Sequence, residues 1–157
     1  APAHSPGPPA AVGWAAGGPA GDNAVLTTPF NGFCYVEGVL SKDDFSAVAA
    51  ECAALLPTLR AEESAYAKNR LGTYVDASSE TQRLLMNGAL AERLTELCGE
   101  RVVPADFPME FRLYPRGGCM EWHTDEQLYV RPQYELVFTV CNTSDSTTEW
   151  REPGEGE

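Results

Sequence analysis

His123 and Asp125 are the residues whose types and spacing are best suited to chemistry in this chain. One residue separates them, so on or just after a β-strand both side chains project to the same face. An imidazole and a carboxylate on one face can supply two of the three protein ligands of a facial triad. Such a triad leaves positions on Fe(II) open for a co-substrate and O₂. The spacing therefore predicts two ligands of an iron site.

The residues around this pair support the same interpretation. A Tyr-Pro turn begins at Tyr114, and it contains Gly117 and Gly118. A strand is expected to precede the turn, and a segment rich in β-branched and aromatic residues, 134–142, follows the pair. Two strands joined by a turn are therefore predicted to present His123 and Asp125 at the end of the second strand.

The segment Phe111 to Asp125 resembles the prolyl 4-hydroxylase-like branch of the 2-oxoglutarate/Fe(II) oxygenases. The resemblance extends over roughly residues 30–150, but only residues 111–125 are specific. It implies that His123 and Asp125 are the first two iron ligands and that Tyr114 lines the 2-oxoglutarate pocket. In this family iron and O₂ decarboxylate 2-oxoglutarate, and the resulting oxidant hydroxylates the substrate.

Two parts of the family pattern have no counterpart after Asp125. The family carries a second histidine on a later strand, followed by a basic residue that binds the distal carboxylate of 2-oxoglutarate. Here the other histidine is His4, and the basic residues after Asp125 are Arg131 and Arg151. We therefore expect this chain alone to hold neither Fe(II) nor 2-oxoglutarate firmly.

Three interpretations of the pair remain open. The chain can be the N-terminal part of an active oxygenase whose distal histidine and arginine lie beyond residue 157. It can be a non-catalytic relative that serves as a structural or accessory subunit of a larger complex, such as a photosynthetic or other membrane complex. His123 can also be an ordinary hydrogen-bonded histidine beside an aspartate. The missing ligand and the short barrel favour the accessory subunit for the chain as given.

Two helices are predicted ahead of the site. Ser41 can cap a helix over about 42–56, which Pro57 should end. Ser79 can cap a second helix over about 80–98, and Gly99 is placed to stop it. The residues between the two helices, 60–78, are polar and rich in turn formers, so we expect them to be irregular.

Short strands are predicted on both sides of the helices, at 33–40, 108–115, 119–123, 134–142 and 147–150. Helices followed by antiparallel strands indicate an α+β fold. With the resemblance, the expected architecture is a partial double-stranded β-helix, a jelly-roll-like set of strands with two supporting helices. Such an incomplete barrel would leave an edge that a partner has to cover.

The first 29 residues form a Pro/Gly/Ala-rich segment, the N-terminal tail, that precedes an expected domain over 30–157. Such a composition cannot bury enough apolar area to offset the entropy lost on ordering. We expect the tail to run extended along another protein subunit, with Trp14 as its interface anchor.

Composition narrows the classes of partner. The formal net charge is −12, which argues against nucleic acid and against anionic membrane surfaces. Five widely spaced cysteines, with no Cys-x-x-Cys pair, do not predict a structural zinc site. No apolar run is long enough to span a membrane, so association with a membrane complex would be peripheral. The Ala-Pro-Ala start is consistent with removal of a targeting segment. We therefore expect the protein in an organelle, such as the stroma or lumen of a plastid.

Overall fold

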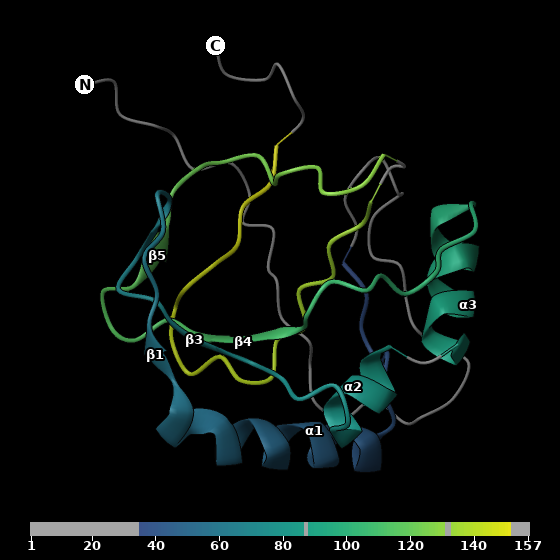
Figure 1. Ribbon diagram of the computed structural model, residues 1–157, viewed down its shortest axis with the longest axis horizontal. Coiled ribbons are helices and arrows are strands. Elements are labelled where there is room, and N and C mark those ends of the chain that lie inside the picture. The colour runs from purple at the N-terminus through teal and green to yellow at the C-terminus, as the bar shows by residue number, and fades with distance from the viewer. Residues whose placement is uncertain (1–34, 87, 131–132, 152–157) are drawn as a thin grey trace. The chain divides into compact units, whose positions relative to one another are not determined.

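The computed structural model describes residues 35–86, 88–130 and 133–151 (Figure 1). It divides into two compact units. One unit comprises residues 43–137, and the second contains the described residues 35–42 and 138–151. The predictions for the N-terminal tail and Trp14 lie outside the described residues. So does His4.

The first predicted helix is confirmed. Helix α1 covers Lys42–Leu55, with Asp43 and Asp44 in its first turn, where carboxylates interact favourably with the helix dipole. It buries Val48 and Cys52. A short 3₁₀ turn, Leu56–Thr58, follows and contains the predicted stop, Pro57. No helix among the described residues has the length and apolar character needed to cross a membrane.

The second predicted helix is correct in position but wrong in continuity, because it is two helices, α2 (Glu80–Leu85) and α3 (Gly88–Cys98). Met86, with φ −112° and ψ 18°, ends the first of them, and Gly88 begins the second. Both predicted ends are confirmed. The hydroxyl of Ser79 accepts the backbone N–H of Gln82 at 3.0 Å, and Gly99 has φ +73° beyond the last turn.

Residues 60–78, expected to be irregular, contain three short strands. Strands β1 (Arg60–Ala61), β3 (Leu71–Tyr74) and β4 (Glu110–Leu113) form an antiparallel sheet in the order β1-β3-β4. Strands β2 (Ala67–Lys68) and β5 (Cys119–Met120) form a separate antiparallel pair. Both pairings join this region to strands far along the chain, which local composition does not reveal (Figure 1).

The later strands are only partly as predicted. Strands β4 and β5 confirm shortened versions of 108–115 and 119–123. The structure shows no strand at 134–142 or over the residues 147–150, and at 35–40 it shows only an isolated bridge at Val36. The α+β class is confirmed. A closed barrel is not seen in the described part of the chain, because a β-prone segment becomes a strand only where a partner pairs with it.

The core of the 43–137 unit is built from small and aliphatic side chains. Its buried apolar members are Val48, Cys52, Leu59, Ala67, Val75, Leu84, Leu85 and Leu90. Helices α1 and α2 lie side by side (Figure 1), since the Glu51 carboxylate of α1 accepts the backbone N–H groups of Glu80 at 3.0 Å and of Thr81 at 2.7 Å. Thr81 itself is buried, so this contact ties the helical layer together.

Candidate metal centre

The chain that carries His123 is anchored by the pair of strands β2 and β5. The register pairs Ala67 with Met120 and Lys68 with Cys119. One residue further along, the N–H of Glu121 donates to the carbonyl of Tyr66 at 2.9 Å, which extends the pairing. The carboxylate of Glu121 also forms an ion pair with Lys68. We call Tyr66 to Lys68 and Cys119 to Glu121 the β2–β5 ribbon, and His123 lies two residues after its end.

A tight turn connects β4 to β5, as the Tyr-Pro-Arg-Gly-Gly sequence predicts. Gly117 has φ +80°, and the N–H of Gly118 donates to the carbonyl of Pro115 at 2.8 Å. A Cβ atom at Gly118 would lie 2.9 Å from that carbonyl oxygen and 3.0 Å from the carbonyl oxygen of Asn69. A side chain at this position would therefore force the turn away from the loop that precedes β3.

The imidazole of His123 is held in one orientation by contacts at both ring nitrogens. Its Nδ1 lies 2.8 Å from the carbonyl oxygen of Glu121. Since a carbonyl oxygen can only accept, this contact places a proton on Nδ1. Its Nε2 lies 3.2 Å from Oδ1 of Asp125. The ring of Tyr66 stacks on it, with centroids 5.3 Å apart and planes inclined by 20°.

The contact between Nε2 and Asp125 is favourable when a proton or a metal cation lies between the two atoms. With Nδ1 protonated, neutral His123 presents a lone pair at Nε2 to a carboxylate oxygen, and two acceptors facing each other are unfavourable. A second proton or a metal cation removes the conflict. Two adjacent ligands, each about 2.1 Å from a divalent metal and at right angles, lie about 3.0 Å apart. The 3.2 Å separation of Nε2 and Oδ1 therefore fits one edge of a metal site.

The backbone carbonyl of Glu121 acts as an outer partner of this edge. Metal-binding histidines usually donate their second N–H to a carbonyl or a carboxylate, which fixes the tautomer and the ring orientation. The hydrogen bond from Nδ1 of His123 to Glu121 has this form. The side chain of His123 is only 23% exposed, although the residue as a whole is open to solvent.

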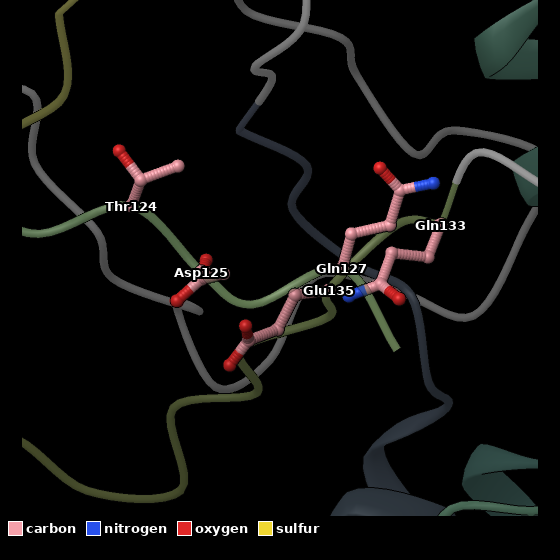
Figure 2. Close-up of a pocket in the computed structure, with 5 residues that line it drawn as sticks. All are labelled: Thr124, Asp125, Gln127, Gln133 and Glu135. Atoms are coloured by element: carbon pink, nitrogen blue, oxygen red, sulfur yellow. The ribbon is translucent and has the colours of Figure 1, made fainter. Parts of the chain in front are cut away.

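Asp125 borders an open depression of about 340 Å³ lined by Thr124, Asp125, Gln127, Gln133 and Glu135 (Figure 2). Figure 2 shows Asp125 and Glu135 close together on separate stretches of chain. Loss of water around the carboxyl raises the pKa of Glu135, and the charge and a hydrogen bond of Asp125 raise it further. Arg112 and His123 lower it without reversing the shift.

The two glutamines of the depression are engaged within its own loop. Gln133 accepts the N–H of Leu128 at 2.8 Å and donates to the carbonyl of Glu126 at 2.9 Å. Gln127 donates to the carbonyl of Tyr129 at 2.9 Å. The charged groups that line the depression are therefore the carboxyls of Asp125 and Glu135, which suit a cation and not an anion.

Tyr114, the predicted 2-oxoglutarate residue, is held by other partners. Its hydroxyl donates to Sδ of Met120 at 3.1 Å and also interacts with the guanidinium of Arg70. Arg70 is only 8% exposed, and its Nε lies 2.6 Å from Oε2 of Glu62. These two atoms are close without hydrogen-bond alignment, so their attraction is mainly electrostatic. The structure thus places Tyr114 beside a buried cation, and the prediction of its role stays open.

A complete set of metal ligands is not assembled by the residues described. Within residues 35–86, 88–130 and 133–151, no three His, Cys, Asp or Glu side chains are arranged to hold a metal ion. His123 and Asp125 are brought together as predicted. Sequence reasoning missed Glu121, which lies two residues before His123. It also missed Glu135 and Tyr66, which reach the pair from segments that no local motif connects to it.

Comparison of the chain with protein-family models, with curated proteins and with solved structures gives no match. The proposal below therefore depends on the residues and on their geometry.

Proposed function

We propose that residues 111–125 form the metal-binding edge of a 2-oxoglutarate/Fe(II) oxygenase of the prolyl 4-hydroxylase-like type. The observation that carries this proposal is the orientation of His123. Its Nδ1 is occupied by the carbonyl of Glu121, and its Nε2 faces Asp125 at the separation of two adjacent metal ligands.

His123 and Asp125 would hold the iron, which with 2-oxoglutarate and O₂ supplies the oxidising chemistry of such enzymes. The chain's own contribution is to fix the imidazole tautomer through Glu121 and to place a carboxylate beside Nε2. A third protein ligand and a basic group for the co-substrate must come from a further part of the protein. On this proposal the N-terminal region of an active oxygenase is the best interpretation.

Metal binding by the pair can be tested with Mn²⁺ as a probe for Fe(II). We expect Mn²⁺ to bind weakly, since two protein ligands retain a divalent ion less well than three. His123→Ala and Asp125→Asn should abolish the binding. Glu126→Gln removes the same charge next to the pair and serves as the matched control. Equal affinity in His123→Ala and in the control would refute the proposal.

A second candidate function, an accessory subunit of a larger protein complex, is favoured by a different observation. Large apolar side chains lie exposed along the chain that follows the pair, namely Leu128, Tyr129, Val130, Tyr134, Leu136 and Val137. Apolar surface of this kind is typical of a face that another protein covers. Such a subunit would require a partner and no iron, and the two candidates are therefore separable by the Mn²⁺ experiment.

A further inference from the structure

We infer that Tyr66 is a positioning residue for the metal-binding edge, because it holds the plane of the His123 imidazole so that Nε2 is directed at Asp125. The inference rests on the proposed function and extends it to a residue 57 positions earlier in the chain. Its starting observation is the stacked contact between the two rings, with a centroid separation of 5.3 Å and an interplanar angle of 20°.

The hydrogen bond to Glu121 alone does not fix the imidazole. It defines the position of Nδ1, but the ring can still turn about the axis from Nδ1 to the carbonyl oxygen. Such a turn moves Nε2 away from Asp125, 3.2 Å distant. A flat ring against one face of the imidazole removes this freedom. Hydrogen bond and stacking together therefore determine where the Nε2 lone pair points.

The backbone of Tyr66 is well placed to impose this restraint. Its carbonyl accepts the N–H of Glu121 at 2.9 Å, and Glu121 is the residue whose own carbonyl binds Nδ1 of His123. On the other side, Oγ of Ser64 accepts the N–H groups of Tyr66 at 3.2 Å and of Ala67 at 3.1 Å. Tyr66 and His123 therefore belong to two chain segments that hydrogen bonds hold side by side.

Tyr66 is 47% exposed, so it is not a residue of the hydrophobic core. The adjacent Ala67, by contrast, is buried and belongs to the core. A half-exposed tyrosine contributes mainly through the contacts of its ring, and the ring of Tyr66 stacks on that of His123. Its aromatic face, and not its hydroxyl, is therefore the functional part.

Two substitutions at Tyr66 should distinguish the contribution of the aromatic face from that of the hydroxyl. Tyr66→Phe keeps the face, so its Mn²⁺ affinity should equal that of the unmutated chain. Tyr66→Leu loses the face, and we expect about a tenfold weaker Mn²⁺ affinity, as for the loss of an outer-sphere partner. Tyr74→Leu is the matched control, because Tyr74 is an exposed tyrosine on β3, in the other sheet.

NMR of the metal-free protein detects the contact between the two rings directly. This signal would not change if Tyr66 served only the general stability of the fold. Nuclear Overhauser contacts should join the rings of Tyr66 and His123, and stacking should shift the His123 ring protons upfield. The Tyr66→Phe variant should keep this upfield shift of the His123 ring protons, and the Tyr66→Leu variant should lose it. If Tyr66→Leu does not fold, Tyr66→Thr retains strand propensity and also lacks the ring. Absence of ring contacts in the unmutated chain would overturn the inference without any variant.

The outcomes distinguish this inference from the function on which it rests. If the unmutated chain binds Mn²⁺ no better than His123→Ala does, both the metal-binding edge and the role of Tyr66 are overturned. If it binds Mn²⁺ through His123, but Tyr66→Leu binds equally well, only the positioning role is overturned. Weaker binding by Tyr66→Leu, with Tyr66→Phe and Tyr74→Leu unchanged, supports both.

Discussion

The pKa of Glu135 depends on the charges of the nearby His123 and Asp125. Its pKa lies above the ordinary value because water is partly removed from it and because Asp125 is both a negative neighbour and a hydrogen-bond partner. In the pH range between the ordinary and the raised pKa, the folded chain binds more protons at this site than the unfolded chain does. The stability contributed by protonated Glu135 is therefore present at acid pH and is lost as the pH rises through the raised pKa.

Glu135→Gln should preserve this contribution at neutral pH, because glutamine stays uncharged and can still form a hydrogen bond with Asp125. We expect the free energy of unfolding of the variant, relative to the unmutated chain, to increase from about pH 4 to about pH 7. Urea denaturation at the two pH values measures the difference. Glu126→Gln is the control for the loss of a charge. A relative stability that falls with increasing pH would contradict the structure.

Residue types and spacing were enough to predict that the side chains of His123 and Asp125 lie together, since both belong to one stretch of three residues. They were not enough to predict Tyr66 or Glu135. Tyr66 reaches the imidazole because β2 pairs with β5. Glu135 reaches Asp125 because Gln133 is hydrogen-bonded to Glu126 and Leu128. Contacts between segments distant in sequence leave no periodic signal in either one.

At the scale of elements, one carboxylate of α1 forms hydrogen bonds with the start of α2. Glu51 accepts two backbone N–H groups at the start of α2, while Ser79 caps a third. The hydrogen bonds from Thr81 are the largest cause that lowers the pKa of Glu51. Stability from Glu51 is therefore present above its ordinary pKa and is lost as the pH falls through the lowered value.

Glu51→Gln should destabilise the fold by about 1.5 kcal/mol at neutral pH, the lower end of the range for hydrogen bonds to a charged group, because glutamine keeps one acceptor oxygen. The loss should shrink at acid pH, where the carboxylate of the unmutated chain is itself protonated. Glu92→Gln, on an exposed position of α3, should change the free energy of unfolding little. Thermal unfolding at neutral and acid pH checks both expectations, and an equal loss at both pH values would show that charge plays no part.

Helices were easier to predict than strands for a physical reason. Capping residues and apolar spacing lie within each helix, and they located α1 and both outer ends of the α2–α3 region. The strands β1 to β3 have two to four residues each and owe their existence to partners. Residues 134–142 have the composition of a strand, yet the structure shows no strand there.

At the scale of the whole molecule, the N-terminal tail remains a prediction of the sequence. The chain carries a net charge of −12, and Trp14 is a large apolar residue in the tail. If the accessory-subunit candidate holds, deletion of residues 1–29 or Trp14→Ala should release the protein from its complex and leave its unfolding temperature unchanged. Co-purification and thermal unfolding test this pair of results. Intact assembly after the deletion would remove support for the tail as an anchor.

The 157-residue chain should not turn over 2-oxoglutarate by itself. The proposed site has two metal ligands, His123 and Asp125, and the residues described include no third one in position. We expect no succinate above background when the purified chain is incubated with Fe(II) and 2-oxoglutarate in air. Iron-dependent release of succinate, lost in His123→Ala, would contradict the expectation and would require a ligand set different from the one seen.

The orientation of His123 is the central claim, and nitrogen NMR of the imidazoles tests it most directly, because the chain has only two histidines. At about pH 8, where an ordinary imidazole is neutral, we predict the Nδ1–H tautomer at His123. Added Zn²⁺ should shift Nε2 of His123 at concentrations that leave His4 unaffected, and Asp125→Asn should remove this difference. An Nε2–H tautomer at His123, or an equal response of the two histidines to Zn²⁺, would contradict the account.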